Sequence, residues 1–199
     1  MRNSFKLMFA ALLFVLLGAG SVMAQTTYYV STSGDDLKDG LTQANALATI
    51  SAAISKTAAG DEIVILTGTY TFTAAAGTVN KAITIKGEGA ANTILQCSGH
   101  TYNLLSFTTA GATLKDLKIL KTDKTGTHNI LYIGASNTTV QDCVIEGQFA
   151  IGDGEVSRAM EIAGGISGLL ITGNTITDLR QPAYINAAAG TLSNNTVER

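Results

Sequence analysis

The sequence predicts an all-β solenoid, a parallel β-helix with a short α-helix covering its N-terminal end. A short apolar phrase recurs along the chain, with steps of 26, 31 and 21 residues between its first apolar positions, Leu114, Val140, Ile171 and Leu192. A period of roughly 20 to 50 residues indicates a solenoid, a propeller or an array. About three short β-rich runs fall within each repeat, as in one coil of a β-helix. No hairpin signal such as Asn-Gly lies between them, which argues against an antiparallel sandwich.

Composition limits the possible classes of protein. The chain has 199 residues, enough for one domain with a core, and 46% of them are hydrophobic. Charged residues make up 14%, well below the typical ~25%. A formal net charge of −2 leaves no basic surface for phosphates, so we expect no nucleic-acid partner.

The first 24 residues have the features of a cleaved signal peptide. Arg2 and Lys6 precede the apolar stretch 7–17, which is too short to span a bilayer comfortably, and small residues follow up to Ala24. We expect cleavage after Ala24, export to the periplasm, the cell surface or the medium, and no membrane span in the mature chain. An uncleaved N-terminal anchor is the alternative.

Residues 25–61 are expected to form an N-terminal strand, a loop and the capping helix, and residues 62–199 the coils. The elements at the start are a strand over 26–31, a turn-rich loop over 33–40, a helix over 48–59, a strand over 63–66 and a turn at 68–70. Gly60 is expected to end the helix. Asp35, Asp36 and Asp39 in the loop lack EF-hand spacing, so turn formation is favoured over a calcium site.

This N-terminal region resembles the signature of secreted right-handed, single-stranded parallel β-helix proteins of the pectate-lyase-like superfamily. One departure is Ala46-Leu47, where such proteins often carry Pro and an aromatic residue. The resemblance implies the fold from about Tyr28 to the end. The resemblance leaves the activity of the protein open, since the superfamily includes polysaccharide lyases, glycoside hydrolases, epimerases and adhesins. The matching residues are Tyr28-Tyr29-Val30-Ser31, Gly34, Asp36, Gly40, Thr49-Ile50, Ala53, Ala58, Gly60-Asp61, Ile63, Leu66 and Gly68-Thr69-Tyr70.

Alignment of the repeats predicts corners. The residue before the second apolar position is Asp116, Asp142, Gly173 or Asn194, all types that tolerate the left-handed region. Asp116 and Asp142 are therefore interpreted as corner residues, although they could pass for a catalytic carboxylate pair.

The side chain of the residue after each corner is expected to point into the coil. This position holds Asn174 and Asn195 in the last two repeats, which predicts a stack of asparagines that satisfies backbone groups at the turn. Cys97 and Cys143 are expected to be buried thiols, too far apart for a disulfide.

The candidate binding surface is the strand seven to nine residues upstream of each repeat. Alternation points one residue of each such strand outward, and in successive coils these are Ser106, Tyr132, Glu161 and Tyr184. A carboxylate between two tyrosines on a flat face fits a sugar, because sugar rings stack on aromatic planes and hydroxyls bind carboxylates. The resemblance implies a cleft along this same face. The alternative is an ordinary β surface with stabilising cross-strand tyrosines.

The sequence does not identify catalytic residues; the candidates are Glu161, Arg158 and Arg180. β-Elimination on a uronate needs a base and a cation, for which Arg158, Arg180 or Lys124 could serve. No resident cofactor or metal is expected unless Ca²⁺ assists such a reaction, and then Asp153, Glu155 or Glu161 would hold it. A hydrolase needs two carboxylates, for which Glu161 with Asp153 is conceivable.

Three functions therefore compete. The first is an exported, non-catalytic β-helix that binds extracellular or cell-surface carbohydrate. The second is a polysaccharide lyase or glycoside hydrolase acting on an acidic polysaccharide, and the third is a purely structural repeat. Because the sequence stops inside a repeat at Arg199, we expect further C-terminal coils or a partner that caps the last coil.

Overall fold

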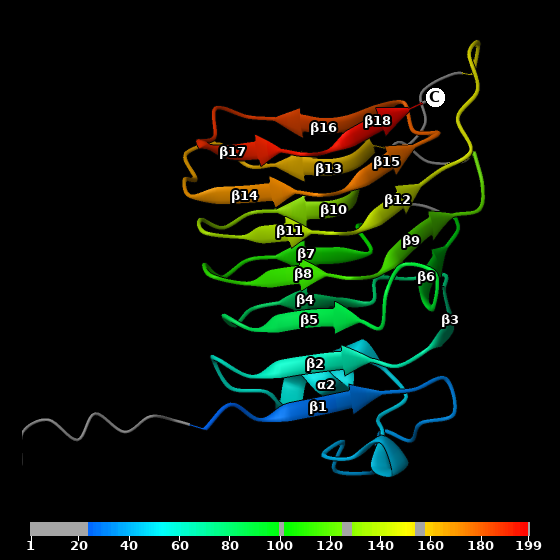
Figure 1. Cartoon of the computed structure of the whole chain (residues 1–199), viewed down its shortest axis with the longest axis vertical. Coiled ribbons are helices and arrows are strands. Elements are labelled where there is room, and N and C mark those ends of the chain that lie inside the picture. The colour runs from blue at the N-terminus through cyan, green and yellow to red at the C-terminus, as the bar shows by residue number, and fades with distance from the viewer. Residues whose placement is uncertain (1–23, 100–101, 125–128, 154–157, 199) are drawn as a thin grey trace, which may run out of the picture.

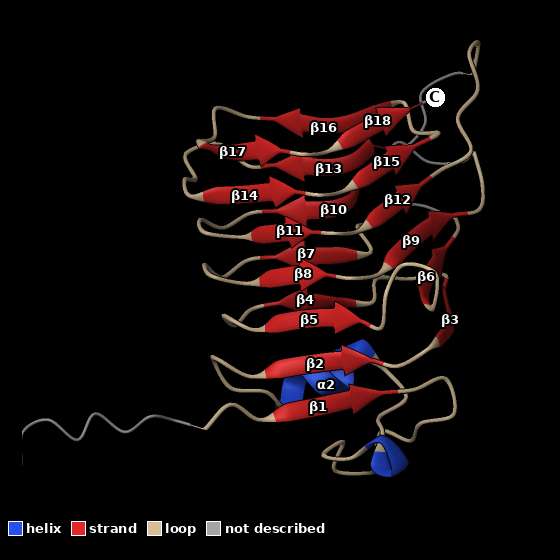
Figure 2. Cartoon of the chain, viewed as in Figure 1, coloured by secondary structure: helices blue, strands red, loops and turns tan. Residues whose placement is uncertain are grey.

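The computed structural model describes residues 24–99, 102–124, 129–153 and 158–198. Within them the chain forms three sheets of parallel strands, and after the first coil it visits the sheets in the same order (Figure 1). Strands of one sheet stack above one another while the chain climbs from coil to coil (Figure 2). The predicted fold, a parallel β-helix with a short N-terminal α-helix, is confirmed.

We name the three sheets A, B and C. Sheet A contains β1 (Thr27–Val30), β2 (Glu62–Ile65), β5 (Thr84–Gly87), β8 (Thr113–Lys115), β11 (Thr139–Gln141), β14 (Leu169–Thr172) and β17 (Gly190–Ser193). Sheet B contains β3 (Gly68–Phe72), β6 (Thr93–Cys97), β9 (Lys118–Lys121), β12 (Val144–Glu146), β15 (Thr175–Thr177) and β18 (Thr196–Glu198). Sheet C contains β4 (Gly77–Val79), β7 (Leu105–Phe107), β10 (Asn129–Ile133), β13 (Arg158–Ile162) and β16 (Gln181–Ile185).

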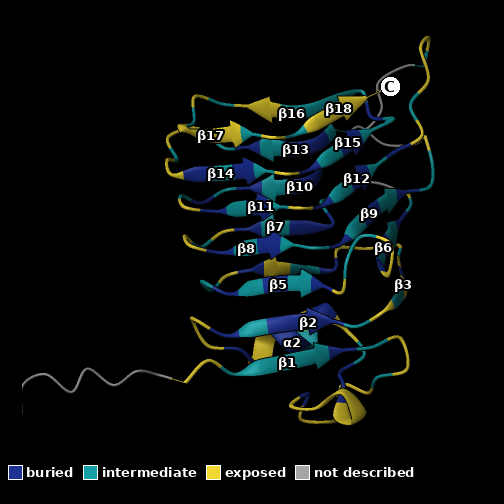
Figure 3. Ribbon diagram, viewed as in Figure 1, coloured by how far each residue is buried: buried dark blue, intermediate teal, exposed yellow. Residues whose placement is uncertain are grey.

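The core lies inside the coil, where the apolar positions of the repeat stack. Leu114 pairs in register with Val140, and Val140 with Ile171, and all three are at most 2% exposed. Buried residues occur in all three sheets (Figure 3). Full burial of such a side chain stabilises the fold by about 1.5–3 kcal/mol. In the last coil Leu192 and Val197 are about half exposed, at 53% and 55%.

The short helix α2 (Ile50–Lys56) takes the place of a sheet C strand in the first coil. It packs against β1, β2 and β4, and it buries Ile50, Ala53 and Ile54. A Cβ at Gly77 of β4 would lie 2.8 Å from Ile54 Cδ1, so a glycine lets the strand edge approach the helix. The predicted cap over the first coil is thus confirmed.

The predicted helix limits of 48–59 were too wide. Thr49 is extended and caps the helix by accepting a hydrogen bond from the Ala52 amide at 3.1 Å. Thr57 is extended again at the other end. Its hydroxyl donates to the Ile54 carbonyl at 2.8 Å.

The region after β2 differs from the sequence prediction. Residues 68–70, predicted as a turn, belong to β3, and β4 was not predicted. The alternation in β3 buries Tyr70 between exposed Thr69 and Thr71, the pattern of a half-buried strand. The Tyr70 hydroxyl donates to the carbonyls of Val30 and Leu66 and so joins β3 to the first coil.

The loop before the helix contains a 3-10 turn, η1 (Gln43–Asn45), and the three aspartates considered for calcium. Asp36 Oδ1 accepts hydrogen bonds from the amides of Ala48 and Thr49 at 2.8 and 2.9 Å. Asp35 and Asp39 each accept from an amide two residues ahead. These are the contacts of a helix cap and of turns, as the sequence favoured.

The corners between sheets A and B adopt the left-handed backbone that the sequence predicts. The φ angles are 57° at Asp116, 51° at Asp142, 68° at Gly173 and 54° at Asn194. The two aspartates are corner residues in successive coils, which confirms that part of the interpretation.

Both cysteines are free and buried, as expected. Burial raises the pKa of Cys97 to about 11 and that of Cys143 to about 12. Among the described residues, no helix has the length and apolar character needed to cross a membrane.

Candidate functional site

The four predicted surface residues lie in one column across sheet C. Tyr132 of β10 pairs in register with Ser106 on one side and with Glu161 on the other, and Glu161 pairs with Tyr184. The first three side chains are partly exposed, and Tyr184 is 46% exposed. Thr78 of β4 extends the column below Ser106, and it was missed because β4 was not predicted. Adjacent members are separated by the strand spacing of about 4.8 Å.

A second row runs along the first residues of three sheet C strands. Asn129 pairs in register with Arg158, and Arg158 with Gln181. Arg158 Nε donates to Gln181 Oε1 at 2.6 Å, and the guanidinium carbon lies 5.0 Å from the centre of the Tyr184 ring. Arg158 is thereby fixed against the column, with its cation over an aromatic face.

The carboxylate of the column is held by Asn129. Asn129 Nδ2 donates to Glu161 Oε2 at 2.5 Å, and Asn129 is 94% buried. An ionised carboxylate can only accept, so the amide nitrogen faces it and the Oδ1 atom points elsewhere. That Oδ1 is buried, and among the described residues it has no hydrogen-bond partner. In the sequence Asn129 ends a polar loop just before a predicted strand, and its contact with the next coil could not be derived from that position.

The charged candidates on the loops are engaged with each other. Lys124 Nζ lies 2.8 Å from Asp153 Oδ2, and the same oxygen accepts from the Ala150 amide at 2.7 Å. The hydrogen bond from Lys124, followed by that from the Ala150 amide, lowers the pKa of Asp153. Arg180 is partly exposed and directly precedes β16, and Glu155 lies outside the described residues.

The two carboxylates considered for hydrolysis contact different groups. Asp153 is paired with Lys124, and Glu161 accepts from Asn129. Among the described residues, which leave out Glu155, no group of three or more His, Cys, Asp or Glu side chains is suited to a metal ion.

No protein-family model and no curated protein sequence matches this chain. Among solved structures it is similar to a rhamnogalacturonan lyase, with 18% identity and a TM-score of 0.58 over 87% of this chain. A pectin methylesterase from carrot gives 17% identity and a TM-score of 0.48, over 89% of this chain and 73% of that one. The chain shares the β-helix fold of the lyase. It spans half of the lyase's length, and identity at this level shows the fold alone.

On this β-helix the sheet C face combines three kinds of group that a sugar can use. Tyr132 and Tyr184 offer ring faces, Ser106 and Thr78 offer hydroxyls, and Glu161 offers an oriented acceptor.

Proposed function

We propose that the protein is an exported β-helix that binds extracellular or cell-surface carbohydrate along sheet C, without turning it over. The observation that carries the proposal is the unbroken, in-register column on an exposed face. Its residues are Thr78, Ser106, Tyr132, Glu161 and Tyr184.

The chemistry of the column supports a hydroxyl-rich polymer as ligand. Sugar C–H groups pack on the faces of Tyr132 and Tyr184, and hydroxyls donate to the carboxylate of Glu161. Asn129 holds that carboxylate by a short hydrogen bond, so little side-chain entropy is lost when it binds. The long axis of the solenoid gives a linear polymer a continuous track.

Export is part of the proposal and is supported by the sequence of residues 1–24. A positive start, a short apolar stretch and small residues before Gln25 are the features read by signal peptidase. Mass spectrometry of the protein from the medium or periplasm, with Gln25 as the first residue, would support this; retention of residues 1–24 would contradict it.

Binding is tested with a mature chain of residues 25–199 on a panel of soluble polysaccharides, neutral and uronate-containing, by affinity electrophoresis and calorimetry. We expect Tyr132→Ala and Tyr184→Ala each to weaken binding about tenfold, since stacking on one ring contributes about 1–2 kcal/mol. Tyr29→Ala on sheet A is the matched control and should bind as the parent does. The proposal fails if no polysaccharide binds, or if both sheet C variants bind as tightly as the parent.

A lyase acting on an acidic polysaccharide is the second candidate, favoured by Arg158, whose guanidinium lies over the Tyr184 ring at the edge of the column. An arginine could neutralise a uronate carboxylate while a base takes the C5 proton. The test is the absorbance of the unsaturated product from uronate polymers, with and without Ca²⁺. Turnover that Arg158→Lys and Glu161→Gln both abolish would establish the lyase, and binding without turnover would exclude it.

A further inference from the structure

Sheet B begins one coil later than sheet A. Strands β1 and β2 pair in sheet A, but the first described strand of sheet B is β3. Between β1 and α2 the chain instead forms the loop that contains η1. Within the described part of the chain, the outer edge of β3 therefore has no neighbouring strand.

The backbone groups on that edge belong to Thr69 and Thr71. The Gly68 amide donates to the Asn92 carbonyl, and the Phe72 carbonyl accepts from Ser98, so Gly68 and Phe72 face β6. In a parallel strand the backbone groups alternate between the two sides. The N–H and C=O groups of Thr69 and Thr71 therefore point to the open side, repeating about every 6.6 Å.

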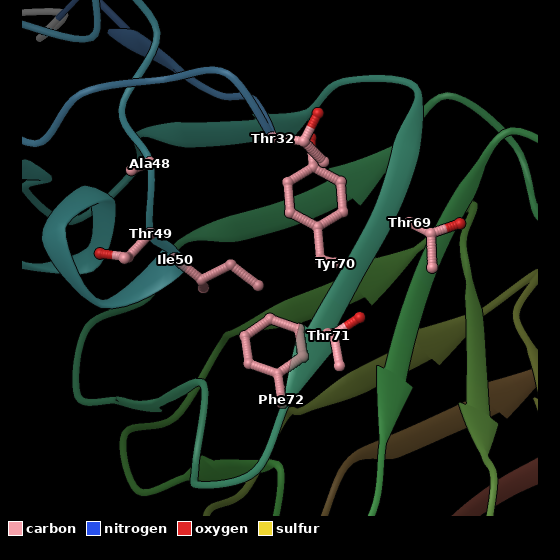
Figure 4. A pocket seen from close by; sticks show the side chains of 8 residues that line it. All are labelled: Thr32, Ala48, Thr49, Ile50, Thr69, Tyr70, Thr71 and Phe72. Carbon is pink, nitrogen blue, oxygen red and sulfur yellow. The ribbon is translucent and has the colours of Figure 1, made fainter.

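This edge borders a hollow of about 350 Å³ whose opposite wall is the loop and the start of α2 (Figure 4). Ile50 and Tyr70 are buried at its base, and the Phe72 ring lies beside Ile50 and is half-buried. The residues that line the hollow carry no charge; they are Thr32, Ala48, Thr49, Ile50, Thr69, Tyr70, Thr71 and Phe72.

We propose that the edge of β3 binds an extended, uncharged peptide segment, which adds to sheet B as the strand that the first coil does not supply. Addition of a strand to an exposed sheet edge is a known mode of peptide recognition, with affinity from main-chain hydrogen bonds and specificity from pockets. Thr69 and Thr71 supply the main-chain partners, and Ile50 with Phe72 accepts one apolar side chain. This site is separate from sheet C and does not depend on carbohydrate binding.

A peptide fits the observations better than a sugar does. The open edge presents a donor and an acceptor at each alternate residue, which is the spacing of another extended main chain. On its other side β3 pairs with β6, so a strand added at the open edge continues the same sheet at the ordinary spacing of about 4.8 Å.

The test uses the mature chain and an acetylated, amidated pentapeptide Thr-Leu-Thr-Leu-Thr as probe. We expect saturable binding by calorimetry, and slower amide hydrogen exchange at Thr69 and Thr71. Methylation of alternate main-chain nitrogens of the probe should weaken binding at least tenfold. Thr71→Pro, which removes only an N–H that faces the open side, should do the same, whereas Thr71→Ala should bind as the parent does.

Several outcomes would overturn the proposal. One is an affinity unchanged both by N-methylation and by Thr71→Pro. Another is equal protection of Thr69 and Thr71 by cellohexaose, which would assign the hollow to a sugar. Protection that rises with protein concentration in the absence of probe would assign the edge to a second copy. If circular dichroism shows that Thr71→Pro does not fold, the N-methylated probe decides alone.

Discussion

Asparagines just after the corners between sheets A and B supply hydrogen bonds that the turning backbone cannot make for itself. Asn174 Oδ1 accepts from the Cys143 amide at 3.0 Å, and its Nδ2 donates to the Val140 carbonyl at 2.9 Å. Asn195 repeats the arrangement one coil later, with its Nδ2 on the Ile171 carbonyl. The predicted asparagine stack is therefore confirmed, and it joins adjacent coils through side chains.

Replacement of Asn174 by Ala should destabilise the fold strongly. It leaves the buried Cys143 amide without its acceptor, at about 1–3 kcal/mol, and it removes a side-chain donor to the Val140 carbonyl. We expect the free energy of unfolding in urea to fall by roughly 2–5 kcal/mol. Asn195→Ala, at a more exposed site, is the control and should cost less than half as much; equal effects would contradict this account.

The two thiols should be unreactive while the chain is folded. Burial, the main cause, raises the pKa of both above the ordinary 9.0, so little thiolate exists at about pH 8. An aromatic disulfide reagent should label neither cysteine in buffer and both in urea. Rapid labelling of the native chain would show that these sites open.

At the scale of elements, the loop before α2 is held by one aspartate. Asp36 reaches 12 and 13 residues along the chain to the amides of Ala48 and Thr49, and its Oδ2 accepts from the Thr49 hydroxyl at 2.9 Å. The Asp35 side chain accepts from the nearby Leu37 amide. The two neighbours therefore give a matched pair for testing the cap.

Asp36→Ala should lower the free energy of unfolding by about 1–2 kcal/mol, the usual cost of losing a helix cap. Asp35→Ala should change it by less than about 0.5 kcal/mol, as for an exposed turn residue. Thermal and urea unfolding of both variants provide the measurement. An equal loss in the two variants would indicate that the loop acts as a whole rather than through Asp36.

Much of each element could be predicted because the signals are local. Alternation placed Tyr132 and Glu161 outward, and the residue types at Asp116 and Asp142 gave the corners. β4 carried too little signal, because it has three residues and one of them is Gly77. Contacts between coils could be predicted only at the repeated positions: the hydrogen bond from Asn129 to Glu161 lies outside them and depends on the lengths of the loops that set the register.

At the scale of the whole molecule, stability should vary along the solenoid, because each coil packs on its neighbours only. The strands β8 to β13 have coils on both sides, whereas β17 and β18 carry largely exposed residues. We expect amide hydrogen exchange to be slowest in β8 to β13 and fastest in β17 and β18. Uniform protection along the mature chain would contradict a coil-by-coil solenoid.

The whole fold should also lose stability at alkaline pH. The unfolded chain ionises its thiols near the ordinary 9.0 and Tyr70 near 10.0, whereas in the fold these pKa values are about 11 for Cys97 and 12 for Cys143 and Tyr70. The contribution of these three groups to the free energy of unfolding is intact below about pH 9. It declines as the pH rises toward their pKa values in the folded chain. Urea unfolding between about pH 8 and 11 should show this decline, with a shallower slope in the Cys97→Ala, Cys143→Ala double variant.

The in-register column on sheet C also gives the proposed binding surface a defined length. Five residues at steps of about 4.8 Å mark out a track of about 19 Å, and each added coil would lengthen it by one step. A polymer that spans the track gains each further contact at high effective concentration, whereas a short oligomer engages only part of it. Affinity should therefore climb with the length of the sugar chain and level off once the track is covered.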